Sequence, residues 1–134
     1  MSSKFRTDLA KTRSEKLKSK PIASVQCGEV WVSLTKATRI FFVRAGRDSL
    51  NISGLNIEVG GDPGKGEFVF LKVKGDLLIG ETRQKAKRGI QEFPDIYLEP
   101  GERLVLNLEQ DEDETRPGSA YGVYYTYYLR PSNV

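Results

Sequence analysis

Residues 121–130 contain five of the six tyrosines of the chain and alternate in the manner of a β-strand. One face of such a strand would carry Tyr121, Val123, Tyr125, Tyr127 and Leu129, and the other would carry Gly122, Tyr124, Thr126, Tyr128 and Arg130. The first set is predicted to face a core. The second set is amphipathic, because each tyrosine joins an apolar ring to a hydroxyl, and this suits a surface that another chain covers. A half-buried strand whose outer tyrosines meet water is the alternative, and both interpretations stay open.

The chain from Pro21 onward consists of short apolar runs separated by Gly, Pro, Asp and Ser. This punctuation is typical of all-β sandwiches and barrels. Strands are expected at residues 22–26, 29–35, 38–44, 49–59, 67–74, 76–81, 95–99 with 102–109, and 121–130. About eight strands of this length predict an all-β fold, a compact β-sandwich or jelly-roll-like domain, over residues 21–134. Helix is expected to cover no more than about a fifth of the residues.

Two of the early runs predict where their side chains point. Alternation places Val30, Val32 and Leu34 inward and Trp31 outward. Residues 39–44 are apolar on both faces, which predicts a central strand or a strand that another subunit covers.

Glycines mark the interruptions of the later runs. The apolar parity of residues 50–59 switches at Ser53-Gly54, which predicts a bulge or tight turn, because glycine accepts the dihedral angles that reset the alternation. A hairpin is expected around Lys74-Gly75. After a Pro100-Gly101 turn, the three leucines at 104, 106 and 108 are expected to face inward.

Three loops carry residues that resemble ligand sites, and each has a simpler interpretation. Residues 60–66 hold glycines and a lysine but lack the spacing of a phosphate-binding loop, so a β-turn is predicted. Residues 82–89 are basic and are expected to form a loop or one short helical turn. The acidic run 111–114 lacks the alternating oxygen ligands of a calcium loop and is interpreted as a solvated turn.

Residues 1–20 form what we call the basic arm. They hold seven Lys/Arg against two acids, a net charge of +5, and subtracting this from the total of +3 leaves −2 for residues 21–134. Phe5, Leu9 and Leu17 are the large apolar side chains of the arm, too few to support an isolated helix. The pattern predicts an extended tether that becomes ordered on a partner, with an ordinary frayed terminus as the alternative.

Composition narrows the function classes. Because the chain has no histidine, it can build neither a Ser-His-Asp nor a Cys-His pair, nor a His-containing zinc site. An enzyme that uses paired carboxylates, Lys or Tyr is the alternative left open, but no enzyme activity, catalytic residue, metal or cofactor is expected. The single Cys27 indicates a protein assembled in a reducing cytoplasm. Neither a secretory signal nor an apolar run of membrane-spanning length is present, so no membrane contact is expected.

The basic arm, the Glu-Pro-Gly-Glu turn at 99–102 before a leucine-alternating strand, and the aromatic final strand together make a recognisable organisation. It resembles the small head proteins of viruses, especially the decoration or cement proteins of tailed bacteriophages. The resemblance implies a homo-oligomer in the virion that staples neighbouring major capsid proteins through its arm, with no catalytic residues. The partner-binding residues expected on this view are Lys4, Phe5, Arg6, Leu9, Lys11, Arg13, Leu17, Trp31, Tyr124 and Tyr128.

Two other functions stay open. A nucleic-acid-binding β-barrel could hold phosphates with the basic arm and with Lys85, Lys87 and Arg88, but the net charge of −2 on residues 21–134 argues against a nucleic-acid partner. A carbohydrate-binding sandwich could use Trp31 and the outer tyrosines as stacking platforms.

Overall fold

The computed structural model describes residues 23–33, 37–110 and 120–132, which contain nine strands and no helix. The strands are β1 (Ser24–Val32), β2 (Thr38–Arg44), β3 (Leu50–Val59), β4 (Glu67–Lys74), β5 (Leu77–Lys85), β6 (Gly89–Glu92), β7 (Ile96–Leu98), β8 (Glu102–Glu109) and β9 (Tyr121–Pro131). Within those ranges nothing forms a helix that could cross a membrane. The basic arm, Leu34 and the acidic run 111–114 lie outside the described residues.

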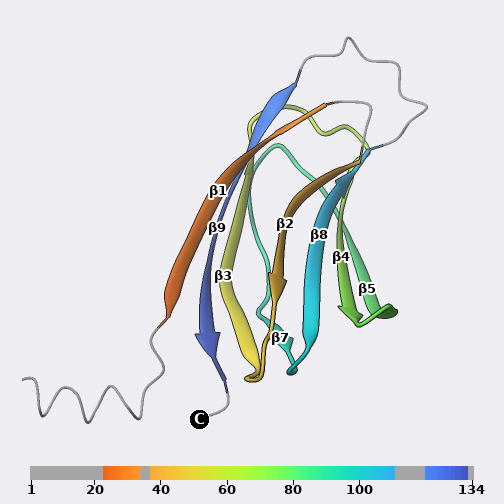
Figure 1. Cartoon of the computed structure of the whole chain (residues 1–134). Helices are drawn as coiled ribbons and strands as arrows, with labels where there is room; N and C mark the ends of the chain where they lie inside the picture. The colour runs from red at the N-terminus through yellow and green to blue at the C-terminus, as the bar shows by residue number, and fades with distance from the viewer. Residues whose placement is uncertain (1–22, 34–36, 111–119, 133–134) are drawn as a thin grey trace, which may run out of the picture.

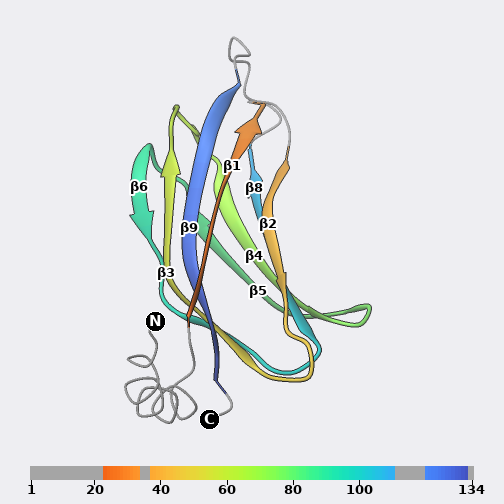
Figure 2. The ribbon, with the colours of Figure 1, turned by 60° about the vertical axis from the view of Figure 1, so that its left-hand side comes forward.

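Two antiparallel sheets pack face to face (Figure 1). The first has the order β1-β9-β3-β6, with β7 also pairing with β3, and the second has the order β2-β8-β4-β5. Figure 2 shows the first sheet in front of the second. Each sheet alternates early and late strands of the chain, which is the strand order of a jelly roll. The predicted all-β, jelly-roll-like sandwich is confirmed.

The core lies between the sheets and is lined by the residues that alternation assigned to it. Tyr121, Val123 and Tyr127 on β9 are buried, and Tyr125 and Leu129 pack against the same cluster. The three leucines at 104, 106 and 108 are buried, as are Val32 and, in part, Val30. The parity switch in β3 is also confirmed, because the register against β9 shifts between Ser53 and Asn56 and Gly54 has φ +61°.

The β1 strand is continuous where two strands, 22–26 and 29–35, were predicted. The break was expected near Cys27-Gly28, but Gly28 lies opposite Tyr125 and keeps its place in the ladder. A Cβ at Gly28 would stand 2.6 Å from the ring carbon Cζ of Tyr125. This glycine therefore makes room for a core-facing tyrosine and does not end a strand.

The β2 strand lies at the edge of its sheet, so the prediction of a central strand is wrong. Its register against β8 shifts between Arg39 and Phe41, and this irregularity turns both Ile40 and Phe41 inward. Phe42 then points outward and is 54% exposed. The bulge thus explains why the sequence of β2 is apolar at consecutive positions. Coverage of Phe42 by another subunit stays a prediction.

The basic cluster 82–89 is also placed differently from the prediction. Residues 82–85 continue β5 as far as Lys85, and residues 89–92 form the unpredicted β6. The hairpin between β4 and β5 turns at Gly75-Asp76, one residue later than expected, with Gly75 at φ +60°. Strand β5 is exposed along almost its whole length, so its sequence lacks the apolar alternation by which a half-buried strand is recognised.

An aromatic cluster joins the two sheets. Phe41 of β2 stacks with Tyr127 of β9 at a centroid distance of 4.6 Å and lies 4.9 Å from Tyr125. Tyr127 is 5% exposed, and burial, with a smaller contribution from Tyr125, raises its pKa to about 12. The usual tyrosine value is about 10, so the native protein holds the Tyr127 proton over a pH range where the unfolded chain has lost it.

We expect an alkaline loss of stability that depends on Tyr127. The neutral hydroxyl is favoured in the native state, so its contribution is fully present below about pH 10 and is lost as pH rises toward 12. At pH 11.5 the loss should be about 2 kcal/mol. Urea unfolding of wild type and Tyr127→Phe at pH 9 and pH 11.5 measures it, because the phenylalanine variant shares every other titration. Equal losses in both proteins would contradict the prediction.

Candidate interaction face

The outer face of the β1-β9-β3-β6 sheet gathers most of the exposed apolar surface. Six of the ten large hydrophobic side chains that are exposed in the described ranges lie on it, which makes it the leading candidate for an interface. We call it the outer tyrosine face. It is defined by Val25, Glu29 and Trp31 on β1, Tyr124 and Tyr128 on β9, Glu58 on β3, Ile90 on β6 and Tyr97 on β7.

Tyr124 occupies the centre of the outer tyrosine face and lies over a glycine. A Cβ at Gly122 would stand 2.9 Å from Cζ of Tyr124, so the absent side chain makes room for the ring. Trp31 is the register partner of Gly122 on the neighbouring strand. Trp31 is 63% exposed and Tyr124 is 41% exposed. Two adjacent strands thus present large aromatic groups at the same level of the sheet.

Tyr128, at the other end of the outer tyrosine face, also lies over a glycine. A Cβ at Gly54 would stand 3.1 Å from Cδ2 of Tyr128, so this ring leans over the bulge of β3. Val25 is the register partner of Tyr128 on β1 and is 58% exposed. The bulge glycine therefore also shapes the outer surface.

The outer tyrosine face is acidic around its central ring. Glu29 on β1 and Glu58 on β3 are the two register partners of Tyr124. The charge of Glu29, a side-chain hydrogen bond to Glu29 and then burial and the charge of Glu58 raise the pKa of Tyr124 above its usual value. The Tyr124 hydroxyl therefore donates to the Glu29 carboxylate. In the described residues no ion pair involves either glutamate.

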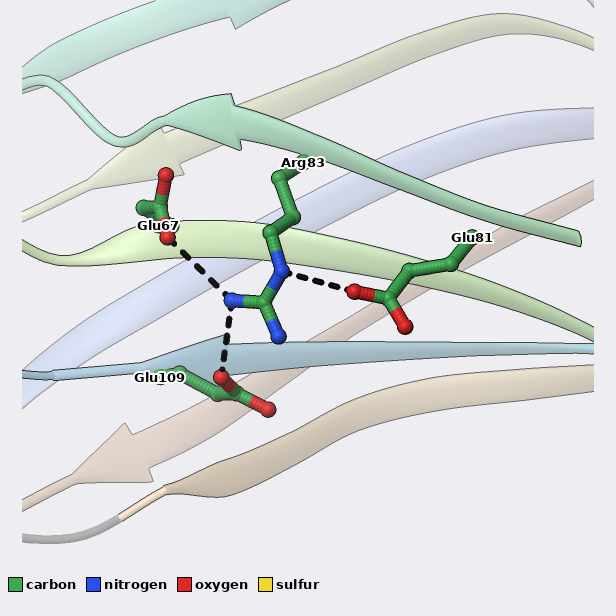
Figure 3. Close-up of polar contacts among 4 residues, drawn as sticks. All are labelled: Glu67, Glu81, Arg83 and Glu109. Carbon is green, nitrogen blue, oxygen red and sulfur yellow. Dashed lines mark hydrogen bonds and ion pairs between the residues drawn. The ribbon is translucent and has the colours of Figure 1, made fainter.

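The outer face of the other sheet differs because it carries a cluster of ion pairs centred on Arg83 (Figure 3). Arg83 of β5 reaches across β4, placing Nη1 3.2 Å from Oε1 of Glu67 and 3.0 Å from Oε1 of Glu109, and Nε 2.7 Å from Oε2 of Glu81. Val69, the β4 partner of Arg83, is 1% exposed although it is on this outer face. Exposed ion pairs add little stability each, but together these four side chains cover the strand below them.

An open groove of about 380 Å³ lies between strands β4 and β5 and residues 93–97. Phe70, Phe93 and Leu104 are among its lining residues, and Lys72 Nζ donates to the Tyr97 carbonyl at 2.9 Å. The described part of the chain contains no group of three or more Cys, Asp or Glu placed to hold a metal. Glu81, Thr82, Gln84 and Asp95 also line the groove, so its wall combines apolar and polar side chains.

The structure places Trp31, Tyr124 and Tyr128 on one face of the sheet, the outer tyrosine face, and all three point outward as alternation predicted. The other expected partner-binding residues, at positions 4, 5, 6, 9, 11, 13 and 17, lie outside the described residues. Sequence reasoning missed Glu29, Glu58 and Ile90, since their place beside Tyr124 depends on strand pairing. The outward parity of Glu29 and Trp31 along one strand was the signal available for the first of them.

Comparison with known proteins bears on the fold alone. No protein-family model and no curated protein matches the chain. A chain in the structure of the infectious bursal disease virus Gx strain superimposes with a TM-score of 0.53 and 9% identity, covering 83% of this chain and 32% of that one.

Two further solved structures superimpose less well. A Bacillus endospore appendage protein has a TM-score of 0.41 and 11% identity, with coverage of 83% and 90%. PliG of Aeromonas hydrophila, a periplasmic inhibitor of g-type lysozyme, has a TM-score of 0.42 and 12% identity, with coverage of 84% and 89%. The present chain thus spans about a third of the viral chain and shares the β-sandwich fold of that part at very low sequence identity.

Proposed function

We propose that this chain is a non-enzymatic structural protein of a tailed bacteriophage virion, a capsid decoration or cement protein or a minor head protein. In this proposal it forms homo-oligomers on the shell and staples neighbouring major capsid proteins through its basic arm. The observation that carries the proposal is the outer tyrosine face, one exposed sheet surface that carries Trp31, Tyr124 and Tyr128.

The composition of this face supports a protein partner. Aromatic residues are enriched at interfaces, and Trp and Tyr are among the residue types that most often dominate binding energy. The inward side of β9 already supplies the core with Tyr121, Val123 and Tyr127. The outward tyrosines are therefore not needed to bury the sandwich, and a binding role accounts for their presence.

The fold is compatible with this role without deciding it. Jelly rolls occur in viral capsid proteins and also in lectins and cupins. A shared fold does not imply a shared function, so the proposal depends on the surface and not on the architecture. The likeness to a viral chain is consistent with a virion protein at the level of the fold.

We expect the double substitution Tyr124→Ser and Tyr128→Ser to weaken self-association at least tenfold while leaving the protein folded. Both side chains are 41% exposed, so their loss removes interface area but little core. Sedimentation equilibrium measures the association, and thermal unfolding of each variant confirms the fold. Tyr125→Ser, which faces inward, should instead lower the melting temperature.

The matched control is Leu77→Ser with Leu78→Ser, which removes two exposed apolar side chains of β5 from the other sheet. It should change the association constant by less than about twofold if binding energy is concentrated on the outer tyrosine face. A tyrosine double variant that associates like wild type, or a control that loses more, would contradict the proposal.

A further inference from the structure

The outer tyrosine face carries negative charge that the described residues do not neutralise. Each ion pair in this part of the chain is made by Arg83 on the opposite sheet, whereas Glu29 and Glu58 flank Tyr124 without a cation. The raised pKa of Tyr124 reports the same negative surroundings. Arg130 is the cation on the same outer side of β9, and it lies in the terminal row opposite Asn51, beyond Tyr128. A partner for the centre of this face should therefore be cationic.

The basic arm of the same chain has the complementary chemistry. It carries a net charge of +5, and residues 21–134 carry −2. Its sequence Lys4-Phe5-Arg6 places an aromatic residue between two cations, and across the strands the face places Tyr124 between two carboxylates. Adjacent strands are about 4.8 Å apart, so the two glutamate backbones lie roughly 10 Å apart. Long Lys and Arg side chains can span that separation from neighbouring positions.

The apolar groups on this face give such a segment places to pack. Trp31 stands beside the acidic row at the level of Gly122, and Ile90, the register partner of Glu58, is 68% exposed. The arm offers Phe5 and Leu9 as apolar anchors. Cations also bind favourably over Trp and Tyr rings, so the same residues accept both kinds of contact.

We propose that the basic arm of one copy binds the outer tyrosine face of a neighbouring copy, with its Lys and Arg residues at Glu29 and Glu58. This inference rests on the self-association part of the proposed function, and it gives the arm a second copy of this chain as its partner in place of a major capsid protein. The direction of β1 favours a neighbouring copy over the arm's own face. The chain enters β1 at Ser24, opposite Leu129 and beside Tyr128, whereas Glu29 lies five residues further along the strand (Figure 2). An arm bound to its own face would have to reverse its direction.

The single cysteine of the chain provides a direct test. Cys27 is exposed on the same outer side of β1, one row from Glu29 and Tyr124. One copy carries Thr7→Cys in a Cys27→Ser background, so that its only thiol is in the arm, and the other copy is wild type. Equimolar full-length chains are mixed under mild oxidation, and mass spectrometry identifies disulfide-linked peptides. We expect the mixed dimer to exceed the Cys27–Cys27 dimer of wild type alone at least fivefold.

Charge variants of the wild-type partner show whether the acidic row holds the arm. Glu29→Gln with Glu58→Gln should lower the yield of the mixed dimer at least fivefold, and 0.5 M salt should lower it as well. The matched control is Asp76→Asn with Glu81→Gln, which removes two exposed charges from the β4–β5 hairpin of the other sheet. It should change the yield by less than twofold.

Three results would overturn the inference. The first is a mixed dimer no more abundant than the Cys27–Cys27 dimer of wild type, and the second is an equal loss of mixed-dimer yield in the two charge variants. The third is a Thr7→Cys chain that retains Cys27 and forms its disulfide within one molecule. If self-association still depended on Tyr124 and Tyr128, the proposed function would stand while this inference failed. If the wild-type chain did not associate at all, both would fail.

Discussion

Replacing Phe68 with alanine is expected to lower the free energy of unfolding by about 3–5 kcal/mol, a large share of the stability of a domain of this size. Phe68 on β4 is fully buried. Its ring meets Phe93 edge to face at a centroid distance of 5.6 Å, and Phe93 lies 5.3 Å from Phe70. Phe93 belongs to the connection between β6 and β7, so the substitution leaves a cavity and also removes the partner of a residue that anchors this connection.

Urea unfolding of Phe68→Ala and wild type measures this loss through the transition midpoint at constant slope. Phe42→Ala is the matched control, because the same atoms are removed from a side chain that is 54% exposed on β2. The control should lose less than about 1 kcal/mol, as surface substitutions usually do. If the two variants lost similar free energies of unfolding, the burial of Phe68 would not contribute to stability as the structure implies.

Local pattern was sufficient for the elements whose two faces differ in polarity. The parity of β9 was correct because one side of that strand meets the core and the other meets solvent, so a single alternation fixes every side chain. The bulge at Gly54 was predicted for the same reason, since the change of parity along β3 needs an extra residue. These two predictions required no knowledge of which strands are neighbours.

Pairing between distant strands could not be read in this way. The position of β2 at a sheet edge depends on its partner β8, more than sixty residues later, and its apolar outer residue Phe42 gave the opposite impression. Strand β5 has exposed residues on both sides, and its charges pair with β4 and β8 through Arg83. A polar strand held by such contacts lacks the periodicity by which strands are recognised.

The aromatic residues of the candidate interface were predictable from the sequence, but its acidic residues were not. Outward parity identified Trp31, Tyr124 and Tyr128 one strand at a time. The acidic row depends on the registers of β1 and β3 against β9, which place Glu29 and Glu58 on either side of one tyrosine. Register is a long-range property, so the charge of this face became apparent only in the folded structure.

The sequence also did not show which glycines pack against tyrosine rings. Among them, Gly61 offers the sharpest test of whether this close packing affects stability. A Cβ at this position would stand 2.6 Å from Cγ and 2.8 Å from Cβ of Tyr121. These atoms are at the root of the Tyr121 side chain, which is 8% exposed and hydrogen-bonded through its hydroxyl to Oε1 of Gln110 at 3.2 Å. The ring therefore cannot swing aside, and the backbone or the core must shift instead.

We expect Gly61→Ala to lower the free energy of unfolding by roughly 1–3 kcal/mol, the usual range for overpacking. Gly46→Ala is the matched control, because a Cβ there meets nothing within 4 Å and neither glycine has a positive φ. Both substitutions restrict the unfolded chain equally, so the control should be neutral or more stable by up to about 1 kcal/mol. Their difference, measured by urea unfolding, isolates the clash with Tyr121 from the backbone effect. If Gly61→Ala were as stable as Gly46→Ala, the close packing of the tyrosine on this glycine would not exist in solution.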